Sequence, residues 1–132
     1  MKIKSIKLVI IMIGAFLLIG CGKQKEDTEA AYQMISMEEA KQIMEEEEDI
    51  VILDVRTQEE YETGHIPGAI CVPNESIGSE EIKELPDKEK KILVYCRSGN
   101  RSKQAAQKLA DAGYKNILEF GGIIDWDGEL EQ

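Results

Sequence analysis

The sequence lacks a hydrophobic run long enough to cross a membrane comfortably, and most of its length is poor in positive charge. Its longest apolar stretch, Leu8 to Gly20, has thirteen residues, whereas a membrane-spanning helix needs about 20. All 26 acidic residues lie after position 20, against 13 of the 16 basic ones. We interpret this negative charge as a solvated surface rather than a docking face. Such a surface repels nucleic acid, so no nucleic-acid partner is expected.

The chain of 132 residues is also too short for a second domain with its own core.

The N-terminus has the pattern of a targeting signal. Three lysines precede the apolar stretch, which is typical of a signal peptide. The segment from Leu18 to Cys21 resembles the lipobox of bacterial lipoproteins, in which cleavage before the cysteine leaves its thiol to carry a diacylglycerol. The alternative is an uncleaved anchor, retained by tilting or bilayer thinning, in which Cys21 is incidental. We expect a signal peptide over residues 1–20 and a lipid on Cys21.

The rest of the chain is expected to form a tether and one domain. Residues 21–31 are polar and have no apolar periodicity, which predicts a flexible tether. The domain is predicted over residues 32–132. With a lipid on Cys21, it would lie outside the cytoplasm, anchored to the bacterial cell membrane.

Short apolar strands alternate with capped helices in this domain. Ser36 and Thr57 each open a capping box, and Gly64 and Gly113 are typical helix stops. Strands are predicted at 32–35, 50–55, 69–72, 91–95 and 116–120, and helices from 36, at 57–64, at 79–85, at 101–112 and after 122. This alternation favours an α/β fold with a parallel sheet covered on both faces. Sites in such sheets lie beyond the carboxyl ends of the strands.

Two cysteines lie inside the predicted domain. Cys71 and Cys96 could pair as a disulfide, or one could be a working thiol and the other a packing residue. Cys71 lies in a short apolar run, where a free cysteine behaves as a small hydrophobe. The second explanation is therefore favoured, with Cys96 as the working thiol.

The segment after Cys96 has the composition of an anion-binding loop. It connects an apolar strand to a helix, so its backbone amides and the helix N-terminus can form a cradle for an anion. A thiol beside Arg97 and Arg101 in such a cradle is expected to have a lowered pKa. The same cradle can hold the anionic sulfur of a persulfide. The residues predicted to form it are Arg97, Ser98, Gly99, Asn100, Arg101 and Ser102.

Four ordered motifs resemble those of the rhodaneses. The single-domain members share a Cys-x-x-x-x-Arg-Ser loop, which Cys96 to Ser102 matches, and an Asp-Val-Arg at Asp54 to Arg56. The segment Glu60 to Ala69 and the C-terminal Gly-Tyr-x-Asn and Gly-Gly-x-x-x-Trp patterns also agree with this family. The resemblance implies a three-layer fold with a five-stranded, mainly parallel sheet.

The resemblance also implies an activity. A sulfurtransferase of this kind carries sulfane sulfur as a persulfide on Cys96, from an anionic donor such as thiosulfate to a thiol or cyanide. It implies no metal or organic cofactor, and we expect a monomer. An alternative within the family is a membrane-tethered binding or sulfide-sensing module without turnover, although an intact Cys96 and Arg101 favour catalysis.

The nearest alternative chemistry is phosphate hydrolysis. Cysteine phosphatases need five residues between cysteine and arginine, whereas four separate Cys96 from Arg101 here. No leaving-group acid is evident either. The shorter loop therefore favours sulfur transfer over phosphate hydrolysis.

The accessory residues have mainly structural interpretations. Asp54 and Arg56 are expected to hold neighbouring loops, and Arg56 is also a candidate for attracting an anionic donor. His65, the only histidine, is interpreted as structural, and Trp126 as part of the core. Arg97 is the best candidate for steering donors, because arginine stays charged at all relevant pH.

Overall fold

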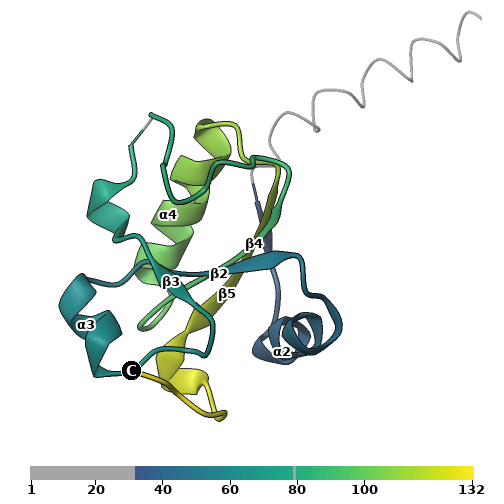
Figure 1. Ribbon diagram of the computed structural model, residues 1–132, viewed down its shortest axis with the longest axis vertical. Helices are drawn as coiled ribbons and strands as arrows, with labels where there is room; N and C mark the ends of the chain where they lie inside the picture. Colours follow the sequence, from purple (N-terminus) through teal and green to yellow (C-terminus); the bar gives the residue numbers. More distant parts are fainter. Residues whose placement is uncertain (1–31, 79) are drawn as a thin grey trace, which may run out of the picture. The chain divides into compact units, whose positions relative to one another are not determined.

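The domain consists of a parallel sheet with helices on both faces (Figure 1). The structure is a computed structural model that describes residues 32–78 and 80–132. The predicted signal peptide of residues 1–20, the lipidation site Cys21 and the tether of residues 21–31 lie outside these described residues. Within the described ranges, no helix has both the length and the apolar character that a membrane crossing requires.

Five strands form one sheet in the order β1-β5-β4-β2-β3, and every neighbouring pair is parallel. The central strand β4 is buried from Ile92 to Cys96, as expected for a parallel strand covered on both sides. The predicted five-stranded parallel sheet is thus confirmed. Its strands are β1 (Gln33–Met34), β2 (Ile50–Asp54), β3 (Ile70–Cys71), β4 (Lys91–Cys96) and β5 (Asn116–Gly122).

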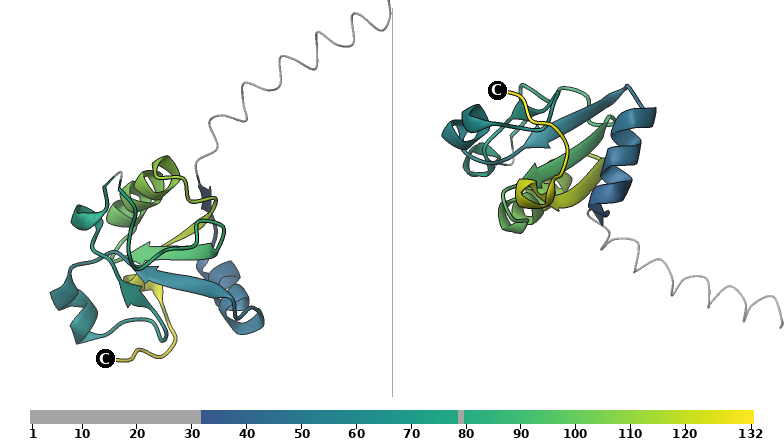
Figure 2. Two further views of the ribbon diagram at one scale, coloured as in Figure 1. Left: turned by 45° about the horizontal axis from the view of Figure 1, so that its top comes forward. Right: turned by 90° about the horizontal axis from the view of Figure 1, so that it is seen from below.

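In the described part of the chain, three α-helices accompany the sheet: α2 (Met37–Glu46), α3 (Gln58–Thr63) and α4 (Asn100–Asp111). Both predicted capping boxes are present, at Ser36 with Glu39 and at Thr57 with Glu60. Helices α4 and α2 lie on opposite faces of the sheet, as Figures 1 and 2 show. Apolar residues of α4 belong to one core cluster and those of α2 to the other. The predicted three-layer arrangement is therefore confirmed.

The helix predicted over residues 79–85 is wrong. Residues 80–85 form a bend and a turn, and the regular element nearby is instead the 3-10 helix η1 (Asn74–Ser76). A helix of seven residues gains little from its own hydrogen bonds. The segment is held by burial of Ile82 and Leu85 and by the Tyr114 hydroxyl, which donates to the Leu85 carbonyl at 2.6 Å.

The predicted C-terminal helix is also wrong. Only a 3-10 turn, η2 (Ile123–Asp125), follows β5, and Ile124 is exposed. The last residues instead run back beside the end of α3 (Figure 2). There the backbone of Glu131 exchanges two hydrogen bonds of 2.9 Å with that of His65. Pairing with His65 therefore replaces the helical hydrogen bonds that the sequence predicted.

Candidate active site

Cys96 is the last residue of β4 and lies at the carboxyl edge of the sheet, as predicted. Three loop residues separate it from α4. The last of them, Gly99, has a φ of 112°, a left-handed conformation that glycine adopts without a steric penalty. This residue turns the chain sharply from the strand into the helix.

The Cys96 sulfur lies among hydrogen-bond donors. The Gly99 N–H donates to Sγ at 3.0 Å, and the Ser102 Oγ lies 3.5 Å from the sulfur. Burial by itself raises the pKa of Cys96. The Ser102 hydroxyl and the backbone amides of Ser102, Gly99 and Ser98 outweigh burial and lower the pKa below its ordinary value of 9.0. The Cys96 sulfur therefore lies among backbone amides and one hydroxyl, which come from Ser98, Gly99 and Ser102 of the predicted loop.

The loop rests closely on β5 at Gly122. A Cβ at this position would lie 2.0 Å from the Arg97 carbonyl oxygen and 2.6 Å from the Ser98 Cα. The same carbonyl accepts a hydrogen bond from the Ile124 N–H at 3.2 Å. The second glycine of the Gly-Gly pair therefore leaves the space in which the cysteine loop lies.

Arg101 joins the loop to α3. Its guanidinium donates to both carboxylate oxygens of Glu60, at 2.8 and 3.1 Å. These hydrogen bonds lower the pKa of Glu60 to about 2. The sequence placed Arg101 near the thiol but did not identify Glu60 as its partner.

The other residues of the loop differ in their exposure to solvent. Gly99 and Ser102 are buried, while Arg97, Ser98 and Asn100 are exposed. Among the described residues, none forms an ion pair with Arg97. Arg97 is therefore a cation at the loop that is available to an incoming anion.

Asp54 and Arg56 form a buried ion pair. The guanidinium Nη2 lies 2.6 Å from Asp54 Oδ2 and also donates to the Gly64 carbonyl at 2.8 Å. The Tyr95 hydroxyl donates to Asp54 and accepts from the Ile66 N–H. The pair thus ties β2, β4 and the end of α3 together, as predicted. Arg56 is 5% exposed, so the idea that it attracts donors from solution is not supported.

Cys71 has a different environment from Cys96. Both are free thiols, so there is no disulfide between them. Partial burial and the charge of Asp54 raise the pKa of Cys71 to about 11. Its Sγ lies 3.6 Å from the Arg56 carbonyl oxygen, an acceptor for the thiol hydrogen. These contacts agree with the prediction of a packing residue.

His65 and Trp126 both make structural contacts. The His65 Nδ1 lies 3.0 Å from the Tyr61 carbonyl, and the two rings stack with centroids 3.8 Å apart. Trp126 packs at the edge of the α2-side core and donates to the Glu129 carbonyl. These contacts agree with the structural interpretations of both residues.

Sequence reasoning missed one buried acid beside the loop. Glu119 of β5 is 2% exposed and receives hydrogen bonds from the Ser102 hydroxyl and the Gly121 N–H. The available signal was a carboxylate inside an otherwise apolar strand, because burying such a group costs free energy unless it is paired or hydrogen-bonded.

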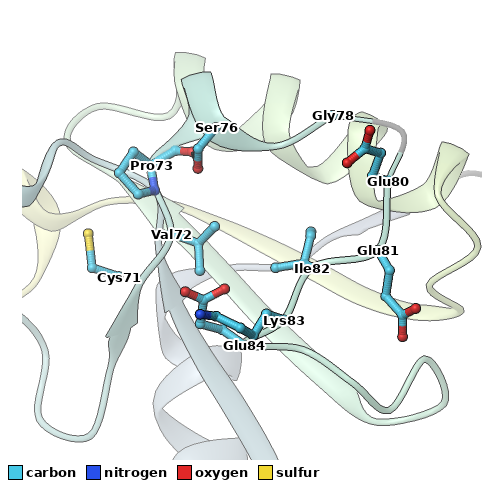
Figure 3. Close-up of a pocket in the computed structure, with 10 residues that line it drawn as sticks. All are labelled: Cys71, Val72, Pro73, Ser76, Gly78, Glu80, Glu81, Ile82, Lys83 and Glu84. Atoms are coloured by element: carbon cyan, nitrogen blue, oxygen red, sulfur yellow. Dashed lines mark hydrogen bonds between the residues drawn. The ribbon is translucent and has the colours of Figure 1, made fainter.

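A surface pocket of about 550 Å³ lies elsewhere, beside the segment that follows β3 (Figure 3). Glu80, Glu81 and Glu84 line it, and Cys71 lies at its edge. Three carboxylates against one lysine, Lys83, repel an anionic donor. The electrostatics therefore favour the Cys96 loop over this pocket as the site of sulfur chemistry.

Comparison with known proteins agrees with the geometry of the loop. The profile of the rhodanese-like domain matches residues 36–129. The thiosulfate sulfurtransferase GlpE of Coxiella burnetii is 40% identical over 96 residues, which cover 72% of this chain and 87% of that protein. The putative sulfur carrier protein YrkF of Bacillus subtilis is 34% identical over 111 residues, which cover 83% of this chain and only 59% of YrkF. A solved structure described as rhodanese with anions from E. coli is 34% identical, has a TM-score of 0.56, and matches over 62% of this chain and 96% of that one.

Proposed function

Because the chain belongs to the rhodanese-like domain family, we propose that it transfers sulfane sulfur, carried as a persulfide on Cys96. The donor is a small anion with a terminal sulfur, and thiosulfate is the simplest example. The acceptor is a thiol or cyanide. The 40% identity to a protein named thiosulfate sulfurtransferase supports this choice of donor.

The reaction has two half-reactions. In the first, the Cys96 thiolate attacks the outer sulfur of thiosulfate, the S–S bond of the donor breaks, and sulfite leaves with the electron pair. Cys96 then carries a persulfide with a negative terminal sulfur. In the second, cyanide attacks that sulfur, thiocyanate leaves, and the thiolate is restored.

The observation that carries this proposal is the donor cradle around the Cys96 sulfur. The Gly99 N–H donates to Sγ at 3.0 Å, and the surrounding donors lower the pKa of Cys96 despite its burial. Preorganised donors stabilise a negative charge on the attacking sulfur and on the persulfide that replaces it. The contrast with Cys71, whose pKa is raised to about 11, supports Cys96 rather than Cys71 as the carrier.

We assign donor attraction to Arg97. Its guanidinium is exposed, whereas Arg101 is engaged with Glu60 and Arg56 with Asp54. The strongly acidic composition of the chain makes a free cation at the loop important for an anionic substrate.

Intact mass measurement tests the proposal. The purified protein is incubated with thiosulfate, separated from it and weighed, and the modified peptide is identified. We expect the mass of one sulfur atom on Cys96 in the wild type and in Cys71→Ala, and no gain in Cys96→Ser. A folded wild-type protein that takes up no sulfur would instead support the binding or sensing module.

We further propose that a lipid on Cys21 anchors the protein at the outer face of the bacterial cell membrane. The apolar stretch that ends in Leu18-Ile19-Gly20-Cys21 supports this, and the polar residues 22–31 suit a tether. Metabolic labelling with a fatty acid should mark the wild type and not Cys21→Ala. Absence of label from the wild type would show that the lipobox interpretation is wrong.

A further inference from the structure

The Ser102 hydroxyl links Cys96 to the buried carboxylate of Glu119. Ser102 Oγ lies 3.5 Å from the Cys96 Sγ and 2.5 Å from Glu119 Oε2. Side chains alternate along β5, and Ile117 packs on the face covered by α4, so Glu119 is directed to that same face. Cys96 packs on this face as well. A thiol, a hydroxyl and a carboxyl group therefore form one continuous chain inside the domain.

The Ser102 hydroxyl has a single hydrogen but several possible acceptors for it. Four acceptor atoms surround the Ser102 Oγ: the Cys96 sulfur, the Glu119 carboxylate, the Gly99 carbonyl at 3.0 Å and the Gly121 carbonyl at 3.4 Å. A serine hydroxyl donates only one hydrogen bond. When its hydrogen is directed to an ionised Glu119, the thiol has to donate to Oγ. When Glu119 is protonated, the carboxyl group donates to Oγ and the serine hydrogen is free for the thiolate.

The Glu119 carboxylate has no counter-cation in the described part of the chain. Its hydrogen-bond donors there are the Ser102 hydroxyl and the Gly121 N–H at 3.1 Å, both neutral and both on Oε2. Two anions buried this close together repel each other. If the thiol proton moves to Glu119, the pair keeps a single negative charge, which shifts from oxygen to sulfur.

We propose that Glu119 accepts the proton of the Cys96 thiol through the Ser102 hydroxyl and thereby generates the attacking thiolate. The S–H bond breaks as its proton binds Ser102 Oγ, while the original Ser102 hydrogen passes to Glu119 Oε2. No oxidant or reductant takes part, and the charge of the site is unchanged. This inference rests on the proposed role of Cys96 as sulfur carrier and makes Glu119 a positioning residue for it.

The charged groups around Cys96 and Glu119 come from few elements. Helix α4 and its preceding loop contribute Arg97, Arg101 and Lys103, and α3 contributes Glu60, which pairs with Arg101. The neighbouring strand β1 contributes only the uncharged Gln33 and Met34. The carboxylate that the hydrogen bonds of Cys96 reach, through the Ser102 hydroxyl, is Glu119.

The pH dependence of Cys96 alkylation tests the proposal. Iodoacetamide reacts with the thiolate, and its rate at Cys96 is followed by peptide mass mapping of the full chain. Two coupled groups titrate in two steps, so the wild type should show two inflections. Glu119→Gln keeps the size and hydrogen-bonding capacity of the side chain but cannot take up the proton, so one inflection should be lost. Ser102→Ala should also leave one inflection, at higher pH than in Glu119→Gln, because a donor to the sulfur is gone.

Glu38→Gln, which removes an exposed carboxylate on α2, is the matched control and should keep both inflections. The proposal is overturned if Glu119→Gln keeps the wild-type inflections, whether its rates are unchanged or uniformly lower. If Glu119→Gln does not fold, carbon NMR of the Glu119 carboxyl group decides. That signal should respond to the ionisation of Cys96 in the wild type and should lack this response in Cys96→Ser, and identical signals in the two proteins at every pH would contradict the proposal. Alkylation of Cys96 requires no sulfur transfer. The proposed function can therefore fail while proton transfer to Glu119 is confirmed, and proton transfer can fail while the proposed function is confirmed.

Discussion

Two thiols at the carboxyl ends of strands differ here because their neighbours differ. Cys96 accepts a hydrogen bond from the Gly99 N–H and lies beside the Ser102 hydroxyl. At Cys71, partial burial and then the charge of Asp54 disfavour a thiolate, and the sulfur faces the Arg56 carbonyl. Burial raises the pKa of both thiols, and the direction of each shift therefore follows from whether hydrogen-bond donors outweigh burial, as they do at Cys96 and not at Cys71.

This contrast predicts the order of alkylation near neutral pH. Iodoacetamide should modify Cys96 before Cys71, although Cys96 is only 1% exposed and Cys71 is half-buried. The reason is that the thiolate is the reactive form, and the pKa of Cys96 is lowered while that of Cys71 is about 11. Peptide mapping after brief treatment measures the order. Earlier modification of Cys71 would mean that exposure, and not ionisation, controls reactivity.

The sequence was sufficient to predict Cys96 as the candidate nucleophile but not its distant partners. Cys96 and its loop are contiguous, so the local pattern contains most of the chemistry. Glu60 lies 41 residues from Arg101, and Glu119 lies 17 residues from Ser102. Their contacts depend on how α3, α4 and β5 pack, and nothing in the local pattern of either acid indicates its partner.

At the scale of elements, the cysteine loop is held between β4, α4 and β5. Its contact with β5 depends on the missing side chain of Gly122, where a Cβ would lie 2.0 Å from the Arg97 carbonyl. The backbone of the loop is therefore positioned by a strand that contributes no side chain at this point.

Gly122→Ala should displace the loop and slow sulfur transfer. A shift of about 1 Å in a reacting group can cost roughly a hundredfold in rate, and we expect a loss of this order in kcat/KM for thiosulfate. Gly78→Ala is the control, because a Cβ there meets nothing within 4 Å. Wild-type kinetics in a folded Gly122→Ala variant would show that the loop position is not critical.

The pair between Arg101 and Glu60 predicts a specific loss of stability in acid. The pKa of Glu60 is lowered from 4.5 to about 2 in the folded protein. A depressed pKa stabilises the fold above the unfolded value, and this contribution disappears as the pH falls from about 4.5 to about 2. Glu60→Gln keeps the capping box but not the ion pair, so its stability should fall less over this range. Urea unfolding of both proteins near pH 6 and near pH 3 measures the difference, and parallel losses would contradict the assignment.

The two wrong helices show where local patterns fail. Both predicted segments, 79–85 and the residues after 122, are short, and each is held by contacts with distant parts of the chain. Tyr114 fixes the first, and His65 fixes the second. Helical periodicity is a weak guide where such contacts provide the backbone with other partners.

At the scale of the whole domain, the buried pair of Asp54 and Arg56 joins three elements. Arg56→Leu leaves the Asp54 charge buried without its cation, and the loss of one partner of a buried pair costs about 3–5 kcal/mol. We expect a decrease of this size in the free energy of unfolding, measured by urea titration. Lys90→Leu, which breaks the solvent-exposed contact with Asp49, should change stability little. Equal effects of the two substitutions would show that the buried pair has no special role.

The central claim, that Cys96 carries one transferable sulfur, is tested most directly by a single turnover. The protein is loaded with thiosulfate, freed of excess donor and mixed with cyanide. The account predicts one thiocyanate per chain, return of the protein to its original mass, and no thiocyanate from Cys96→Ser treated in the same way. A loaded wild-type protein that releases no thiocyanate, or a Cys96→Ser variant that releases as much as the wild type, would contradict it.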